Sequence, residues 1–187
     1  MSTTDRRTLI AEAAVDLIAT AGLRALTHRA LDTALDLPAG STSYYFRTRR
    51  ALLDAVADHL TERSRADFLA TAAPRDLTAE TVARDVADRL DRMLTTRRHH
   101  LIARQALLVD PLPEPDLRAR LARSLFSPER ATDLFRALGG DEPAPLAADF
   151  LAVLEGAVLT ELSAAPEDRP ARLRRLLSAY LRGAIAP

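Results

Sequence analysis

The placement of the prolines constrains the fold of this chain more than any other feature of its sequence. The eleven prolines cluster between stretches in which apolar residues recur at every third or fourth position, so most of them separate helices and do not interrupt strands. Six glycines are too few for a β architecture with many turns. Aromatic residues make up only 4% of the chain, and a core built from Leu, Ala and Val favours helices. We therefore predict an all-α fold with about nine helices.

Composition also limits the surroundings and the chemistry of the protein. The absence of cysteine excludes disulfides, thiol catalysis and thiolate metal sites. No apolar run approaches the roughly 20 residues that span a bilayer, and the polar start of the chain is unlike a signal peptide. Because 26 basic residues balance 26 acidic residues, any binding to nucleic acid must be local. We expect a cytoplasmic protein with no membrane partner and no cofactor.

Three short apolar segments near the start have the spacing of a helix-turn-helix. We expect the first helix over residues 5–20, with Gly22 as its C-cap. Thr27 is a favourable N-cap for a second helix, and a third helix can form over residues 41–46 after a break. Short helices with a tight turn between the last two form a helix-turn-helix module. We assign this module to residues 1–48.

The remainder of the chain, residues 49–187, is predicted to form a second, helical domain. Expected helices cover residues 49–70, 78–96, 98–109, 114–138, 145–164 and 169–185, the first of them a long connector. Pro128 should kink or split its helix, because proline costs about 3 kcal/mol inside a helix but is favoured in a first turn. A helical bundle of this size can bury a core of its own.

The segment from Gly40 to Phe46 has the residue types that a DNA-reading helix needs. In a helix-turn-helix the last helix enters the major groove, while the helix before it and the turn after it grip phosphates. Small residues at the start of the segment let its backbone approach DNA, and Phe46 should pack inward. Adjacent helical residues point about 100° apart, so at least one of Tyr44 and Tyr45 should face the DNA.

The stretch from Thr27 to Leu53 resembles the tetracycline-repressor (TetR) family of bacterial regulators. In that family the second helix begins at a threonine. The DNA-reading helix begins with a glycine followed by serine or threonine, and it ends with an aromatic residue followed by Phe. A basic residue then begins the connector helix. The matching residues here are Thr27, Gly40, Ser41, Tyr45, Phe46 and Arg49. Asp36 stands where the family usually has glycine, and Ser43 where an aromatic residue is common. Aspartate tolerates left-handed backbone better than most residues, so we expect the turn to be kept.

The resemblance implies which residues contact DNA. Phosphate contacts would fall to Thr27, Tyr45 and Arg49, and base contacts to His28, Arg29, Ala39, Ser41 and Tyr44. The guanidinium of Arg29 can bond guanine O6 and N7 together. The alternative for Arg29 and His28 is a solvated side chain without a DNA contact. The predicted DNA-binding set also includes Gly40, Ser43 and Arg47.

The resemblance further implies that the second domain binds a ligand between its helices and pairs two chains through its last two helices. Each of these helices has more apolar surface than one neighbour needs, which favours a four-helix interface over the alternative of an ordinary intramolecular core. The predicted interface residues are Phe150, Val153, Leu154, Ala157, Val158, Leu173, Leu176, Leu177, Tyr180 and Leu181.

Candidates for the ligand pocket are polar or adaptable side chains near the apolar stripes. They are Met93, His99, His100, Gln105, Phe126 and Glu155. Glu155 could meet a cationic ligand or an arginine from a neighbouring helix. We expect no metal site, because consecutive helical residues such as His99 and His100 diverge and no other cluster along the chain has ligand spacing.

The predicted function is that of a ligand-responsive homodimeric repressor, which releases a palindromic double-stranded DNA operator when a small-molecule effector binds. The alternative is a helical protein-binding adaptor with a head shaped like a helix-turn-helix. A helical enzyme is a distant third, because the sequence has no set of nucleophile, histidine and acid, no glycine-rich phosphate loop and no His/Glu metal motif.

Overall fold

The protein is all-helical over the residues that its computed structural model describes, which are 3–69, 76–110, 115–165 and 167–185. Ten α-helices and one turn of 3-10 helix, and no strand, occur in these ranges. The predicted fold class is therefore confirmed. Among the helices described, none has both the length and the apolar character needed to cross a membrane.

The chain divides into two compact units, and each unit is assembled from two separate stretches of sequence. The first unit contains the described residues of 1–70 and 99–125, and the second those of 71–98 and 126–187. The boundary that the sequence suggested, between residues 48 and 49, falls inside the first unit. The reason is that the connector helix packs along the first helix and shares its core.

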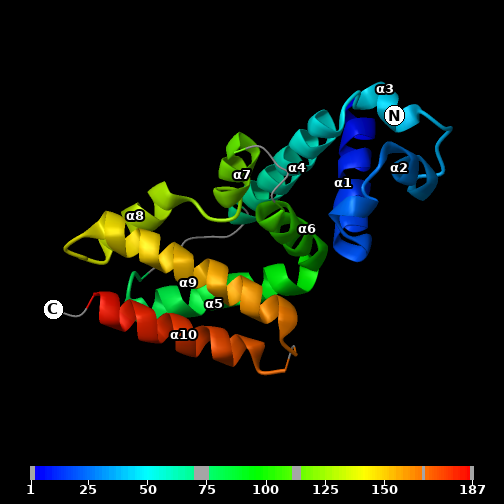
Figure 1. Ribbon diagram of the computed structural model, residues 1–187. Coiled ribbons are helices and arrows are strands. Elements are labelled where there is room, and N and C mark those ends of the chain that lie inside the picture. Colours follow the sequence, from blue (N-terminus) through cyan, green and yellow to red (C-terminus); the bar gives the residue numbers. More distant parts are fainter. Residues whose placement is uncertain (1–2, 70–75, 111–114, 166, 186–187) are drawn as a thin grey trace. The chain divides into compact units, whose positions relative to one another are not determined.

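The first unit carries the helix-turn-helix. Its elements are α1 (Thr3–Ala21), the 3-10 turn η1 (Leu23–Ala25), α2 (His28–Ala34), α3 (Ser41–Tyr45), α4 (Arg49–Leu69), α6 (Arg98–Val109) and α7 (Pro115–Ala122) (Figure 1). Apolar side chains from α1, α4, α6 and α7 meet in one core, which includes Ile10, Val15, Leu52, Val56, Leu107 and Leu117. Longer helices thus support the two short ones, α2 and α3.

The second unit consists of α5 (Ala79–Thr96), α8 (Pro128–Ala137), α9 (Pro143–Ser163) and α10 (Arg169–Ala184). Helix α10 packs along α5, and α8 packs along α9. The rings of Phe135, Phe150 and Tyr180 join α8, α9 and α10, with Phe150 and Tyr180 stacked at 5.5 Å between centroids. The Tyr180 hydroxyl donates to the Leu146 carbonyl at 2.8 Å, so the polar end of this cluster is satisfied.

The helix predicted over residues 114–138 is in fact two helices, α7 and α8. Ser127 caps α8, where its Oγ accepts from the Arg130 N–H at 3.3 Å, and Pro128 occupies the first turn. Of the kink or split predicted at Pro128, the structure shows a split, which accounts for ten helices in place of nine. Two predicted helix ends, residues 70 and 114, lie outside the described residues.

Candidate DNA-binding surface

Helix α2 begins at the residue that the sequence predicted. Thr27 has extended backbone, and its Oγ1 accepts from the Ala30 N–H at 3.1 Å. This N-cap uses the oxygen of the hydroxyl as an acceptor and leaves the O–H as a donor. Because Thr27 is exposed, that donor can also reach a phosphate oxygen.

The turn between α2 and α3 depends on two residues with positive φ. Asp36 has φ 50° and Gly40 has φ 90°. The left-handed backbone expected for Asp36, in place of the usual glycine, is therefore confirmed. The Leu37 N–H donates to the Asp32 carbonyl at 2.8 Å and closes the end of α2.

The start of α3 is held by Asp32, whose importance the sequence analysis missed. Asp32 is only 5% exposed, and its carboxylate accepts from the backbone N–H groups of Gly40 and Thr42, each at 2.8 Å. Burial by itself raises the pKa of the Asp32 carboxyl, but the hydrogen bonds from Thr42 and Gly40 outweigh burial and lower the pKa below its ordinary value. The available signal was an aspartate between the apolar positions of a short helix, eight residues before a glycine.

The other end of α3 is held by two basic side chains. The carbonyl of the buried Phe46 accepts from His28 Nε2 at 2.7 Å. Arg7 donates to the Tyr45 carbonyl at 2.7 Å, and its guanidinium lies 4.3 Å from the centroid of the Phe46 ring. The His28 imidazole is thus engaged within the head, although the resemblance implied that it faces bases.

Arg49 is also engaged within the chain. One terminal guanidinium nitrogen donates to the Leu23 carbonyl at 3.0 Å, and the other donates to the Leu26 carbonyl. These bonds join the start of α4 to the turn before α2. The phosphate contact implied for Arg49 stays a prediction, because Arg49 is exposed and its guanidinium has further N–H groups beyond the two that serve these carbonyls.

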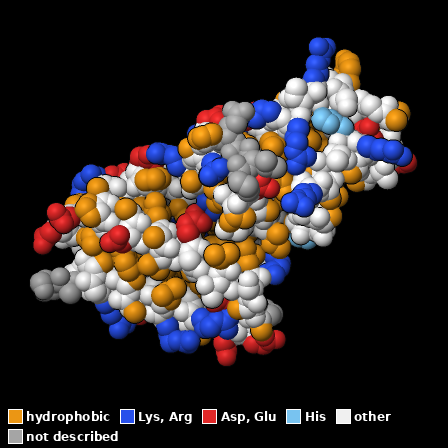
Figure 2. All heavy atoms as spheres, in the orientation of Figure 1, with side chains coloured by type: hydrophobic (Ala, Val, Ile, Leu, Met, Phe, Trp, Pro, Cys, Tyr) orange, Lys and Arg blue, Asp and Glu red, His pale blue; other side chains and the backbone are white. Residues whose placement is uncertain are grey.

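The remaining candidates lie on the surface around α3. Tyr44 is 80% exposed, whereas Tyr45 is half-buried and meets the Tyr44 ring edge-on at 5.2 Å between centroids. Ser41 is half-buried and donates from Oγ to the Pro38 carbonyl at 2.6 Å. The exposed candidates are Arg29, Ala39, Gly40, Ser43 and Arg47. Arginine side chains stand out from the part of the molecule that carries α1 to α3 (Figure 2).

The six candidate pocket residues do not lie in one unit. His99, His100 and Gln105 belong to the first unit, and Met93, Phe126 and Glu155 to the second. His99 Nδ1 lies 2.7 Å from a carboxylate oxygen of Asp16, while His100 is buried. The other four side chains are half-buried.

A buried carboxylate in the second unit was missed in the sequence, because its partner comes from another helix. Glu161 of α9 is 5% exposed and accepts two hydrogen bonds from Arg172 of α10, at 2.6 and 3.0 Å. The hydrogen bonds that Arg172 donates to Glu161 raise the pKa of its guanidinium. The pair joins α9 to α10 within the unit.

Most of the predicted dimer-interface residues lie in the core of the second unit. Seven are buried, namely Phe150, Leu154, Ala157, Val158, Leu173, Leu177 and Leu181, and Val153 and Tyr180 are half-buried. Within the unit, α8 packs against α9 and α5 packs against α10, so these seven side chains are already covered, and their part in an interface between chains stays a prediction. Of the ten predicted residues only Leu176 is exposed, at 44%, and Leu159 of α9 is exposed at 50%.

Comparison with known proteins shows to which family this chain belongs. Residues 77–187, well over half of the chain, match the family model described as "Tetracyclin repressor-like, C-terminal domain". No curated protein matches the chain.

Solved structures of similar proteins cover nearly the whole chain. The multidrug binding protein EbrR in complex with ethidium is 28% identical, with a TM-score of 0.66 over 91% of this chain and 98% of EbrR. A TetR-family member from Streptomyces coelicolor A3 is 28% identical, with a TM-score of 0.68 over 92% of this chain and 98% of its own. A transcriptional regulator from Rhodococcus sp. Rha1 is 18% identical and supports the fold alone, with a TM-score of 0.79 over 98% of this chain and 96% of its own.

A helix-turn-helix supported by longer helices, together with a separate helical unit, defines a class of DNA-binding transcriptional regulators. The chain belongs to the tetracycline-repressor (TetR) family, whose members are regulators of the ligand-responsive repressor type. Proteins of this family are in general transcription factors and not enzymes. The resemblance first noted between Thr27 and Leu53 is thus confirmed by a match to a different part of the chain.

Proposed function

We propose that this protein is a homodimeric repressor that binds a palindromic operator and releases it when a small molecule binds. One observation carries the proposal. Helix α3 is fixed at one end by the Asp32 carboxylate, which accepts from backbone N–H groups, and at the other by hydrogen bonds from His28 and Arg7, while its fourth residue, Tyr44, is 80% exposed. A short helix that is rigidly held and presents an exposed aromatic hydroxyl is suited to reading a groove.

The residues of the head divide into two roles in this proposal. Arg29 and Tyr44 face base edges, where Arg29 can make two hydrogen bonds to guanine, and the small residues Ala39 and Gly40 let the backbone come close. Phosphates are bound by exposed or half-buried donors, namely Thr27, Ser43, Tyr45 and Arg47. The positioning residues Asp32, His28 and Arg49 act by fixing the geometry of α2 and α3.

Pairing of two chains follows from the spacing of DNA grooves. Two reading helices must lie about 34–36 Å apart to enter successive major grooves, so a single head cannot read a palindrome. We assign the pairing surface to the exposed sides of α9 and α10, which carry Leu159 and Leu176. Gly156 of α9 is exposed, and a Cβ built on it would meet nothing within 4 Å, so a second backbone can approach there.

The effector that we propose is a planar organic cation. The relative EbrR is described in complex with ethidium, malachite green and proflavin. In this chain the second unit holds the half-buried carboxylate of Glu155, together with the half-buried side chains of Met93 and Phe126. Carboxylate, thioether and aromatic groups are suited to such a cation. Release of DNA requires that the effector bind the DNA-incompetent arrangement more tightly than the competent one.

The proposal is tested by selecting DNA from a random pool with the purified protein and measuring affinity for the selected sequence by fluorescence anisotropy. Specific binding is expected to yield a palindrome, and its affinity should fall linearly with salt on a double-logarithmic plot. Arg29→Ala should weaken binding by about tenfold or more. Arg136→Ala, which removes an exposed arginine of α8 in the second unit, is the matched control.

Three outcomes of these measurements would count against the proposal. Affinity that does not depend on DNA sequence would exclude operator binding. Equal effects of Arg29→Ala and Arg136→Ala would exclude base reading by α2. Loss of DNA binding in Arg29→Ala with dimerisation intact would instead exclude the adaptor alternative.

Ethidium added to the protein–DNA complex should lower the anisotropy, whereas unchanged anisotropy at saturating ethidium would contradict the proposed effector class.

A further inference from the structure

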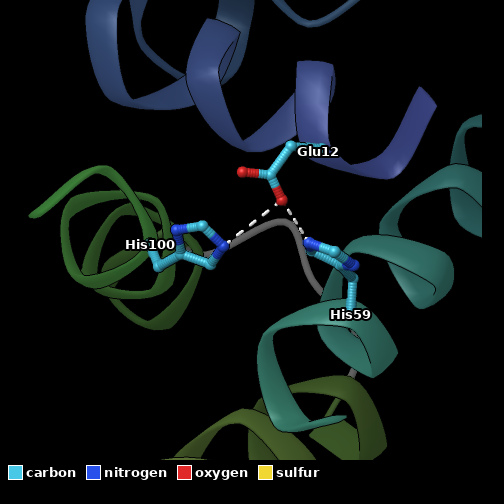
Figure 3. Close-up of side chains that lie close together, drawn as sticks. All are labelled: Glu12, His59 and His100. Carbon is cyan, nitrogen blue, oxygen red and sulfur yellow. Dashed lines mark hydrogen bonds and ion pairs between the residues drawn. The ribbon is translucent and has the colours of Figure 1, made fainter. Parts of the chain in front are cut away.

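Three side chains with metal-binding atoms converge in the first unit, and none of them belongs to the DNA-binding surface. They are Glu12 of α1, His59 of α4 and His100 of α6, and in Figure 3 both imidazole rings point toward the carboxylate of Glu12. The ligating atoms of the three residues all lie within 4.8 Å of one another. Figure 3 shows that the cluster draws one residue from each of three helices.

The distances suit a small divalent cation. His100 Nε2 lies 3.4 Å from Glu12 Oε2, and His59 Nε2 contacts the same oxygen. Zinc is bound at 2.0–2.2 Å by nitrogen and oxygen ligands, so two ligands of a tetrahedral site lie about 3.4 Å apart. The distance between His100 Nε2 and Glu12 Oε2 already has this value. The distance between His59 Nε2 and Glu12 must increase, which the Glu12 side chain allows because it is 44% exposed.

The two histidines are held by the packing of their helices. The side chain of His59 is 15% exposed and that of His100 is 11% exposed. Their ring centroids lie 5.7 Å apart, and the ring planes differ by 33°. Since the rings are confined and present Nε2 to one oxygen, little ordering is needed for a cation to bind.

We propose that Glu12, His59 and His100 form a binding site for a divalent transition metal of the zinc class. Two imidazoles and one carboxylate make up a common ligand set for zinc with an open fourth position. Here that position faces the exposed side of Glu12, where water or a small anion completes the coordination. When the metal binds, both groups donate electron pairs to the cation, so the proton between His59 Nε2 and Glu12 passes to Nδ1 of the same ring if the imidazole is neutral, or to water if it is charged.

The bound metal would join the first helix of the head to α4 and α6. Such a cross-link stabilises the folded unit by a free energy that grows with the logarithm of the ratio between the free metal concentration and the dissociation constant. The site was not visible along the sequence, where only the neighbours His99 and His100 suggested ligands. Residues 12, 59 and 100 are brought together by the packing of α1, α4 and α6 alone.

The test uses the full chain without an affinity tag, freed of metal by a chelator and then titrated with Zn²⁺ or Co²⁺. We expect one zinc ion per chain, a higher melting temperature with zinc, and visible absorption bands of four- or five-coordinate Co²⁺. His59→Gln, His100→Gln and Glu12→Gln should each weaken zinc binding by about 100-fold. Glu12 is half-exposed, so Glu12→Gln also tests the site without disturbing the core.

The chain provides a matched control in His99→Gln, which removes the neighbouring histidine that pairs with Asp16. This variant should bind zinc as tightly as the unaltered chain. Zinc binding that survives both His59→Gln and Glu12→Gln would overturn the proposal, as would a loss that is equally large in His99→Gln. Failure to bind any zinc at micromolar concentration would also overturn it, whether or not the protein binds DNA.

Discussion

The helix-turn-helix and the α9–α10 pair use their side chains in opposite ways. Around α3 the surface is made of polar groups such as Tyr44 and Arg29, while hydrogen bonds from side chains to the backbone hold the helix. Along α9 and α10 the apolar stripes turn inward, and only single leucines such as Leu176 remain outside. A polar side chain that is predicted to bind a partner is therefore expected at the surface. An apolar side chain with the same prediction is more often buried in the core of its own unit.

The largest expected effect concerns two adjacent residues of α10. Leu177→Ala should lower the free energy of unfolding by about 3 kcal/mol, because Leu177 is fully buried and its removal leaves a cavity. Leu176→Ala should change the same quantity by less than about 0.5 kcal/mol when the unfolding of the monomer is followed. Urea denaturation checks both values. Similar losses for the two variants would remove the distinction between the core and the exposed side of α10.

Leu176→Ala also sharpens the assignment of the pairing surface. Because Leu176 is 44% exposed, its removal should weaken dimerisation and leave the fold intact. Sedimentation equilibrium measures the dimer dissociation constant. A dimer unaffected by Leu176→Ala and by Leu159→Ala would place the pairing surface elsewhere on the second unit.

The next effect concerns the buried anchor of α3. Asp32→Ala removes a carboxylate that accepts from two backbone N–H groups, and it should cost about 2 kcal/mol of unfolding free energy together with specific DNA binding. Asp32→Asn retains one acceptor oxygen and should give an intermediate loss. Circular dichroism with urea and anisotropy with operator DNA measure the two properties. Full DNA affinity in Asp32→Ala would contradict the anchoring role.

Tyr44→Ala is expected to have a smaller effect, and one on binding alone. The ring is 80% exposed, so the free energy of unfolding should change little. Operator affinity should fall by about tenfold, which corresponds to about 1.4 kcal/mol. The same anisotropy titration measures this loss. Loss of stability without loss of affinity would show that Tyr44 belongs to the core of the head.

The smallest effect is the response of the head to acid. Because hydrogen bonds lower the pKa of Asp32 in the folded protein, its stabilising contribution is fully present above its ordinary pKa, about 3.9, and is lost as the pH falls through the lower folded value. Unfolding free energies measured from pH 5 downward should fall less steeply in Asp32→Asn than in the unaltered chain. Parallel curves would mean that Asp32 does not titrate in this way.

Several local features could be predicted from the sequence because they depend on neighbouring residues. The cap at Thr27, the left-handed Asp36 and the split at Pro128 each follow from the chemistry of a few adjacent positions. The family resemblance rested on the same kind of local spacing. Its confirmation came from residues 77–187, the part of the chain where spacing alone was least specific.

Other features could not be predicted because they depend on which elements meet. Arg49 and His28 are candidates for DNA contact, and the folded head also gives them the carbonyl groups of Leu23, Leu26 and Phe46 as hydrogen-bond partners. The sequence alone does not tell how far a guanidinium group lies from a carbonyl group that is more than twenty residues away along the chain. Buried Asp32 shows the converse case, a polar residue whose role depends on the N–H groups of the next helix.

The order of the helices, several of their caps and breaks, and the exposed polar character of the DNA-reading segment follow from local propensity and periodicity, so they can be read from the sequence. Tertiary structure alone decided which neighbour covers each apolar stripe of α9 and α10. It also decided that Glu12, His59 and His100 meet. Periodicity identifies the face of a helix that must be buried, but the covering partner is set by packing between elements distant in the chain.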